Sequence, residues 1–262
     1  MLTLGAYQFS ARLGDVRYNL DRMAAIIGGL AAGEVDVLAF PEMCDTGYAM
    51  DVVRREAMDW STDHLQEIRH LARTKRTAVL IGLSERVEGS IFNAVAVITR
   101  TGELSFRYRK THLVTIAPIH EERTITPGDS LGFFELDGLP CGVLTCYELR
   151  FPEIARTLVL RGARILFVPA AWPQARVAHL LTLTRARAIE NQVFVVLAAR
   201  TGTDGGTAFS GQSLVADPYG EVLASAGQAA EGLVTATVDL ATIDACRGRI
   251  TALTERRPGL YF

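Results

Sequence analysis

Short apolar runs alternate with amphipathic helical stretches along the whole chain, and this alternation restricts the folds open to it. Strands are predicted at 3–10, 35–40, 78–83, 93–99, 104–108, 131–136, 141–145, 165–168, 193–198, 212–216, 221–224 and 233–238, and helices at 17–30, 62–75, 152–160 and 177–191. Runs that are apolar throughout, such as 35–40, are typical of strands buried on both faces. Strands and helices interleave without a linker or repeat, which predicts one α/β domain with a mixed, largely buried sheet.

The charge of the chain argues against several classes of partner. Its 262 residues carry 27 basic and 29 acidic side chains, a formal net charge of −2, so no global field favours nucleic acid or anionic membranes. The first residues lack the pattern of a secretory signal, and no window approaches the roughly 18 apolar residues of a membrane span. We therefore expect a cytoplasmic protein that binds neither nucleic acid nor membrane.

The cysteines and histidines do not predict a metal centre. The four cysteines, Cys44, Cys141, Cys146 and Cys246, form no C-x-x-C pair, which argues against a disulfide framework and a zinc cluster. None of the five histidines stands at metal-ligand spacing from another histidine or a cysteine. We expect no metal and no other cofactor, and one thiol is free to act as a reagent.

Lysine occurs only at Lys75 and Lys110, so arginine supplies the other 25 of the 27 basic residues. A retained lysine can mark a place where a compact ammonium is needed and a planar guanidinium would not fit. It can equally be a chance survivor on a solvated face. The composition alone leaves both interpretations open.

Three chemically reactive residues follow predicted strands. Glu42 comes directly after the run 35–40, Cys146 directly after the run 141–145, and Lys110 follows the hairpin strand 104–108. Taken singly, the glutamate is more simply a helix cap or a solvated acid, the cysteine a core residue and the lysine a surface residue. Together, a thiol, a carboxylate and an ammonium are sufficient parts for acyl transfer.

Six segments resemble those of the nitrilase, or carbon-nitrogen hydrolase, superfamily, in that family's order. They are Phe40-Pro41-Glu42, Tyr108–Leu113, Pro127-Gly128-Asp129, Cys146–Glu153, Arg185–Asn191 and Asp217–Glu221. The resemblance implies a single domain over residues 1–262 with a four-layer α-β-β-α sandwich of the nitrilase type. It also implies a homodimer or higher homo-oligomer, with a C-terminal arm at about 251–262 that crosses to the partner. The alternative for this tail is a solvated chain end.

The resemblance further implies a catalytic triad of Glu42, Lys110 and Cys146. Counting back from the Pro-Gly-Asp segment places the family's second glutamate on Glu121 rather than on Glu122. In this interpretation Cys146 attacks a carboxamide, Glu42 takes and returns the proton, and ammonia leaves a thioester that water hydrolyses. Lys110 and the backbone N–H of Tyr147 would stabilise the oxyanion.

The substrate is indicated by weaker signals. Trp172 would form a pocket wall or be a core aromatic, and Arg150 would bind a substrate carboxylate or form a structural ion pair. The string from Cys146 onward resembles the ω-amidase branch, which deamidates small 2-oxo acid amides. The sequence departs from that branch at two positions: Glu148 stands where Asp is usual, and Leu180 stands where Trp is frequent. We predict hydrolysis of a small linear carboxamide, ω-amidase-like. The alternatives are an N-carbamoyl amidohydrolase and a non-catalytic binding or scaffold relative.

The remaining cysteines are expected to pack. Cys44 lies close enough to Glu42 to be a minor pocket residue, although core packing is the simpler assignment. Cys141 is five residues before Cys146, and an odd offset on a regular strand faces the opposite side. Cys246 falls on a predicted C-terminal helix.

Overall fold

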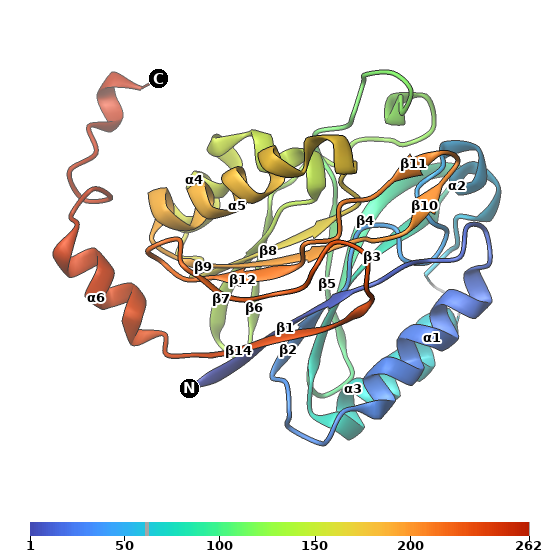
Figure 1. Cartoon of the computed structure of the whole chain (residues 1–262), viewed down its shortest axis with the longest axis horizontal. Coiled ribbons are helices and arrows are strands. Elements are labelled where there is room, and N and C mark those ends of the chain that lie inside the picture. Colours follow the sequence, from blue (N-terminus) through green and yellow to red (C-terminus); the bar gives the residue numbers. More distant parts are fainter. Residues whose placement is uncertain (61–62, 262) are drawn as a thin grey trace.

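Two six-stranded sheets form the centre of the molecule in a computed structural model that describes residues 1–60 and 63–261 (Figure 1). The first sheet has the order β14-β1-β2-β3-β4-β5 and the second β13-β12-β9-β8-β7-β6. The first contains β1 (Leu2–Gln8), β2 (Val37–Ala39), β3 (Ala78–Val87), β4 (Ser90–Ile98), β5 (Leu104–Arg109) and β14 (Gly232–Val238). The second contains β6 (Gly132–Leu136), β7 (Leu139–Val143), β8 (Ile165–Ala170), β9 (Phe194–Ala199), β12 (Leu214–Ala216) and β13 (Val222–Ser225).

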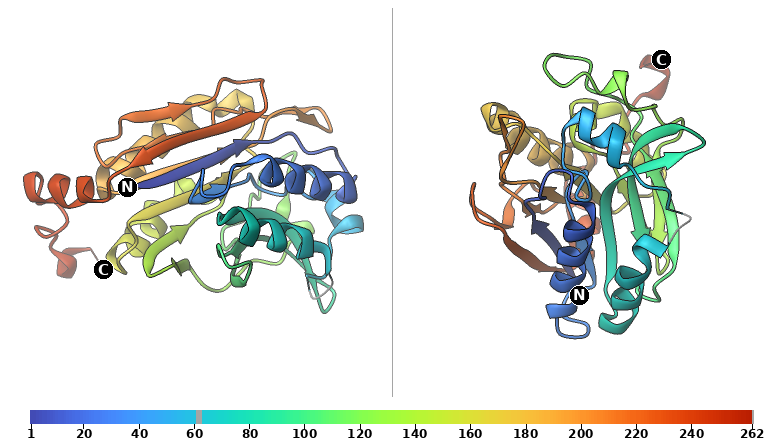
Figure 2. Two further views of the ribbon diagram at one scale, coloured as in Figure 1. Left: turned by 90° about the horizontal axis from the view of Figure 1, so that it is seen from below. Right: turned by 90° about the vertical axis from the view of Figure 1, so that its right-hand side faces the viewer.

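Helices cover the outer face of each sheet, and Figure 2 shows the layers from two further directions. The helices are α1 (Val16–Gly29), α2 (Met50–Glu56), α3 (Gln66–Lys75), α4 (Pro152–Leu160), α5 (Val177–Asn191) and α6 (Ala241–Arg249). Apolar side chains of α1 and α3 pack on the first sheet, and those of α4 and α5 on the second. The predicted α/β class and the four-layer sandwich are confirmed. None of the helices within 1–60 and 63–261 is long and apolar enough to cross a membrane.

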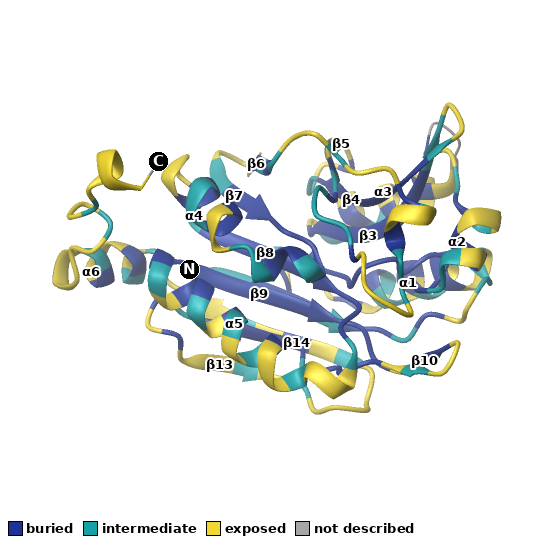
Figure 3. Ribbon diagram, turned by 90° about the horizontal axis from the view of Figure 1, so that it is seen from above, coloured by how far each residue is buried: buried dark blue, intermediate teal, exposed yellow. Residues whose placement is uncertain are grey.

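Successive side chains of one strand pack into two different hydrophobic cores, one on each face of the sheet. On β8, Ile165 and Phe167 face the core between the two sheets, while Leu166 and Val168 pack under α4 and α5. This period of two is why central strands such as β8 and β9 are dark blue in Figure 3, beneath helices with exposed outer faces. Burial on both faces accounts for the continuous apolar runs in the sequence.

The alternation pattern alone predicts one sheet, and this expectation is wrong. Strand periodicity reveals that both faces are buried but does not reveal which strands pair, because parallel and antiparallel neighbours are found in both sheets. The short elements α2, β10 (Thr203–Asp204) and β11 (Thr207–Ala208) were not predicted either, since they are too brief to show a period. The predicted helix 62–75 begins in the described residues as a 3₁₀ turn at Asp63–Leu65, and residue 62 lies outside them.

The chain ends away from the sandwich. After α6 the segment 250–261 lies at one end of the molecule: Leu253 packs against the core under α4 and α5, while Leu260 and Tyr261 are 66% and 50% exposed (Figure 1). This is the segment predicted as a C-terminal arm.

Gly82 on β3 sets how closely the chain around Glu42 approaches the first sheet. A Cβ built at Gly82 would lie 2.3 Å from the Pro41 carbonyl oxygen and 2.6 Å from the Glu42 Cα. No side chain fits there, so glycine is required for the backbone of Glu42 to pass against the strand.

Gly82→Ala should therefore displace Glu42 and destabilise the fold. Overpacking costs about 1 to 3 kcal/mol, so the urea midpoint and the turnover should both fall. Gly232→Ala on β14 is a matched control because nothing lies within 4 Å of its built Cβ. An unchanged urea midpoint and turnover in Gly82→Ala would contradict this assignment.

Candidate active site

A buried ammonium lies between two buried carboxylates at the carboxyl ends of the strands. Lys110, which follows β5, places its Nζ 2.8 Å from Glu42 Oε1, and 3.0 and 2.9 Å from the two carboxylate oxygens of Glu121. All three side chains are completely buried. The structure thus brings together three of the predicted catalytic residues and places Glu121, not the exposed Glu122, on the lysine.

Neutral donors hold the two carboxylates in place. The Asn93 side-chain amide on β4 donates to Glu42 Oε1 at 2.7 Å and to Glu121 Oε1 at 3.1 Å. The Ala171 N–H, just past β8, donates to Glu42 Oε2 at 2.8 Å, and the Val114 N–H donates to Glu121 Oε2 at 2.7 Å. Each carboxylate therefore has fixed partners on both oxygens, which makes its position rigid.

Cys146 begins a 3₁₀ turn, Cys146–Arg150, directly beyond β7. Its φ is +50°, a left-handed conformation that a side-chain-bearing residue adopts only when its surroundings impose it. A side chain on such a sharp turn between a strand and a helix is presented to a pocket.

Glu148 fixes this turn to the segment that carries Lys110. Its Oε1 accepts from the Tyr108 hydroxyl at 2.6 Å, from the Thr111 N–H and hydroxyl at 2.7 Å each, and from the His112 N–H at 3.2 Å. Its Oε2 accepts from the Thr145 N–H at 2.7 Å. One buried carboxylate thus joins the turn that begins at Cys146 to the residues adjoining Lys110.

The electrostatics of the site keep the thiol neutral and the lysine charged. Burial raises the pKa of Cys146 well above its usual range, the charge of Glu42 raises it further, and the Lys110 ammonium acts against both. For Lys110, burial lowers the pKa, but Glu121 and Glu42 together with Cys146 outweigh it and raise the pKa above its ordinary value. Burial and the charge of Glu42 thus favour the protonated form of the Cys146 thiol, and the Lys110 ammonium opposes them.

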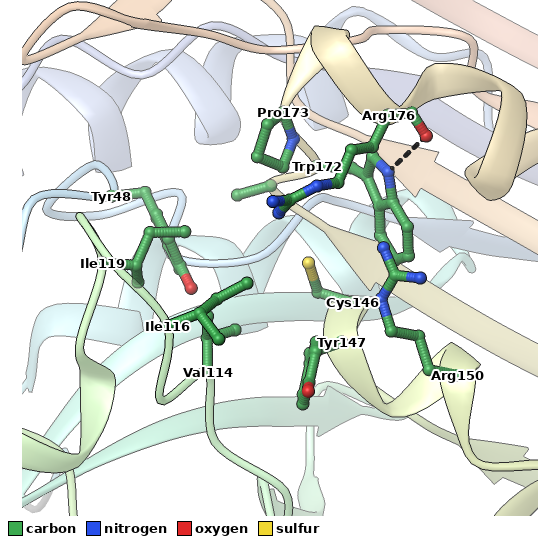
Figure 4. A pocket seen from close by; sticks show the side chains of 11 residues that line it. Tyr48, Val114, Ile116, Ile119, Cys146, Tyr147, Arg150, Trp172, Pro173 and Arg176 are labelled. Carbon is green, nitrogen blue, oxygen red and sulfur yellow. Dashed lines mark hydrogen bonds between the residues drawn. The ribbon is translucent and has the colours of Figure 1, made fainter.

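A pocket with about 350 Å³ of empty space, open solvent at its mouth included, leads to the sulfur (Figure 4). Its lining includes Tyr48, Cys146, Tyr147, Arg150, Trp172 and Arg176. The Arg150 guanidinium carbon lies 4.5 Å from the centre of the Trp172 ring, and the indole N–H donates to the Arg176 carbonyl at 2.8 Å. The three predicted substrate-binding residues, Tyr147, Trp172 and Arg150, thus meet at one pocket with the cysteine.

The other candidates have packing or structural positions. Cys44 donates to the Pro41 carbonyl from within the first core, Cys246 is buried on α6, and Cys141 lies between the sheets. The geometric reason given for Cys141 is wrong, because β7 ends at Val143 and Cys146 is no longer on the strand. Lys75 donates to the Leu30 carbonyl, so only one of the two lysines lies at the site.

Three residues of the site were not predicted from the sequence: Asn93, Tyr48 and Arg176. Asn93 and Tyr48 lie within or beside apolar stretches, where an amide or an aromatic ring is ordinarily packing, and Arg176 is one arginine among 25. In the described part of the chain, no group of three or more His, Cys, Asp or Glu side chains is arranged to hold a metal ion.

The fold and this geometry define a carbon-nitrogen hydrolase. The family model with that description matches residues 3–248, and the chain belongs to this family. It is 33% identical to the 2-oxoglutaramate amidase of Bacillus subtilis over 99% of both chains, and 30% identical to the omega-amidase NIT2 of Bos taurus over 93% of this chain and 91% of that one. The predicted family is confirmed.

A solved structure supports the same assignment. Protein XC1258 of Xanthomonas campestris, described as a CN-hydrolase superfamily protein with an arsenic adduct in its active site, superimposes with a TM-score of 0.89 at 29% identity. The match covers 98% of this chain and 97% of that one.

Glu42→Gln should separate two effects of this carboxylate. Removing its charge removes one cause of the raised pKa of Cys146, so the thiolate fraction at pH 8 and the rate of alkylation by iodoacetamide should rise. Ammonia release should instead fall by about 10² to 10⁴, the usual contribution of a general base. Glu122→Gln, on an exposed neighbour, is the control; slower alkylation in Glu42→Gln would contradict these electrostatics.

Glu148→Gln should loosen the turn that carries Cys146. An amide nitrogen in place of one oxygen faces N–H donors, and a buried unsatisfied donor costs about 1 to 3 kcal/mol. We expect a lower free energy of unfolding in urea and a lower kcat. The control is Glu153→Gln, an exposed acid on the adjoining helix, and equal stability of the two variants would show that the network around Glu148 contributes nothing.

Proposed function

We propose that this protein is a cysteine amidase that converts a small linear carboxamide to its carboxylate and ammonia through a thioester on Cys146. The observation that carries the proposal is the buried Glu42–Lys110–Glu121 cluster, which interacts electrostatically with the sulfur at the end of a narrow pocket. The family and the amidases among its relatives support the same chemistry.

Acylation starts from the protonated thiol, because burial raises the pKa of Cys146. The proton of Cys146 passes to Glu42 as sulfur bonds to the carbonyl carbon, and the C=O electron pair moves to oxygen, facing Lys110 and the Tyr147 N–H. When the tetrahedral adduct collapses, the C–N bond breaks and Glu42 returns the proton to nitrogen. Ammonia leaves and the thioester remains.

Deacylation reuses the same groups. Glu42 takes a proton from water as the water oxygen attacks the thioester, and the C–S bond then breaks. The proton held by Glu42 returns to sulfur, which regenerates the thiol and releases the carboxylate. Glu121 keeps the lysine charged and aimed through its two bonds to Nζ. Every step uses groups of this chain and one water.

Cationic groups at the pocket favour an acidic substrate. Arg150 and Arg176 both line it, and neither has a carboxylate within 4 Å among residues 1–60 and 63–261. Two guanidiniums without a carboxylate partner, near an amide-cleaving sulfur, suit a short acid that carries a carboxamide at its other end. 2-Oxoglutaramate has this form, and we propose an ω-amidase-like specificity on these grounds.

Cys146→Ala should abolish ammonia release while leaving the fold intact, and Lys110→Arg should be severely impaired because a planar fork cannot replace a compact charge aimed at one oxygen. Loss of an oxyanion donor typically costs about 2.7 to 4 kcal/mol in the barrier, or about 10² to 10³ in kcat. Circular dichroism monitors folding. Near-wild-type turnover in either variant would remove the role assigned to that residue.

A panel of 2-oxoglutaramate, glutamine, propionamide, an N-carbamoyl amino acid and a nitrile, scored for ammonia and carbon dioxide, tests the substrate class. We expect ammonia alone, fastest from 2-oxoglutaramate, and Arg150→Met should raise KM about tenfold for that acid but not for propionamide. Carbon dioxide release would indicate an N-carbamoyl amidohydrolase. Uniformly slow alkylation of all four thiols, with no turnover, would indicate a scaffold.

The exposed apolar end of the chain supports association of two copies, and we propose a homodimer. Ile250, Leu260 and Tyr261 are each at least 50% exposed, as expected of side chains that bury against a partner. Light scattering on the full chain and on a chain truncated after residue 250 tests the association.

We also propose a cytoplasmic location. The four cysteines are all free, which is in keeping with the reducing cytoplasm.

A further inference from the structure

One of the six segments typical of the family, Arg185–Asn191, takes no part in the proposed mechanism. It lies on α5, and the side chain of its Arg187 is only 5% exposed. The Arg187 Nε and Nη2 both donate to the carbonyl oxygen of Leu149, at 3.1 and 2.7 Å, and its Nη1 pairs with Glu190 at 2.8 Å. A buried guanidinium thus holds one backbone carbonyl of the Cys146–Arg150 turn.

The sequence after the turn explains why this carbonyl needs a side-chain partner. In a 3₁₀ turn each carbonyl accepts from the N–H three residues further on, and for Leu149 that residue is Pro152, which has no N–H. Leu149 is completely buried, so bulk water cannot replace the missing donor. The planar fork of Arg187 supplies two N–H groups to the two lone pairs of the oxygen. Arg187 therefore fixes the peptide that joins Leu149 to Arg150.

The other end of the turn carries the sulfur and is fixed by Glu148. The Glu148 Oε2 accepts from the Thr145 N–H at 2.7 Å, and Cys146 follows with its φ of +50°. Figure 4 shows the Cys146 sulfur and the Arg150 guanidinium both facing the pocket from this one turn. Because the turn is held at both ends, the backbone positions of Cys146 and Arg150 are fixed relative to each other.

The guanidinium of Arg150 is restrained as well. Its carbon lies 4.5 Å from the centre of the Trp172 ring, and Trp172 is 2% exposed, with its indole N–H bonded to the Arg176 carbonyl. A guanidinium stacked on a fixed aromatic face keeps little of its conformational freedom. The cation that would bind a carboxylate and the sulfur that would attack a carboxamide are therefore held a constant distance apart.

A substrate of the proposed amidase is bound at two points, and the inference rests on that proposed function. Sulfur bonds to the carbonyl carbon at one end of the substrate, and Arg150 binds the carboxylate at the other. A chain with one methylene too many or too few cannot satisfy both points unless one of them moves. We propose that the Cys146–Arg150 turn, held by Arg187, selects the chain length of the ω-amido acids that the enzyme hydrolyses. Arg187 is then a positioning residue that determines specificity.

A series of four acids that differ by one methylene each tests this inference: malonamate, succinamate, glutaramate and adipamate. For the wild type we expect one maximum of kcat/KM along the series, with a fall of about tenfold or more for each methylene away from it. Arg150→Met should flatten this profile, because the carboxylate is then no longer held.

Arg187→Lys keeps the positive charge beside Glu190 but replaces the fork by a single ammonium. The ratio of kcat/KM between the best chain and its neighbours should shrink about threefold or more, the effect of one lost hydrogen bond. Arg187→Gln, which leaves no buried charge behind and still carries N–H donors, is a second variant with the same expected effect. Arg185→Lys is the matched control, because Arg185 donates to the Gly220 carbonyl from the same helix at 2.7 Å. It should keep the wild-type profile.

Circular dichroism verifies that each variant is folded, and the other results overturn the inference. A flat wild-type profile, or one that Arg150→Met leaves unchanged, would show that the turn does not select chain length. An equal fall for all four acids in both Arg187 variants would make Arg187 a support of the fold alone, and an unchanged profile would remove its role. A wild-type enzyme that releases no ammonia from any of the four would instead contradict the proposed function, before any variant is made.

Discussion

The buried Lys110 ammonium between Glu42 and Glu121 is the interaction on which the rest of the site depends. Removing charges from water costs several kcal/mol per ion unless each is paired and hydrogen-bonded. Here both carboxylates have N–H donors besides the lysine, from Asn93 and from the Ala171 and Val114 backbone. The segments that supply these partners must therefore be in place before the charges can be buried together.

Two carboxylates link the sheets by hydrogen bonds: Glu42 reaches from the first sheet to the second, and Glu148 from the second to the first. Glu42, after a strand of the first sheet, accepts from the Ala171 N–H at the end of β8 in the second. Glu148, on the turn after β7 of the second sheet, accepts from Tyr108 on β5 of the first and from Thr111 just beyond it. These reciprocal bonds fix Cys146 and Lys110 relative to each other, although Cys146 follows a strand of the second sheet and Lys110 a strand of the first.

The sequence predicted the features that depend on nearby residues, and it did not predict those that depend on contacts between distant parts of the chain. Buried strands and the helices 152–160 and 177–191 were predicted closely because their periods and boundaries are local. The division into two sheets came only from the family resemblance, because pairing is a long-range property. Counting back from the Pro-Gly-Asp segment selected Glu121 rather than Glu122. The structure gives the physical reason, because Glu121 is buried against Lys110 and Glu122 is exposed. Asn93 and Tyr48 could not be predicted, since neither belongs to a recognisable motif and each acquires its neighbours only through folding.

The central claim is that sulfur 146 becomes covalently acylated, and mass spectrometry of the enzyme quenched with acid during turnover tests it most directly. With a small carboxamide in excess, the account predicts a mass increase equal to the acyl group on the peptide that contains Cys146, released by hydroxylamine as expected of a thioester. Ammonia production with Cys146 unmodified throughout, or with the acyl group on another residue, would contradict it.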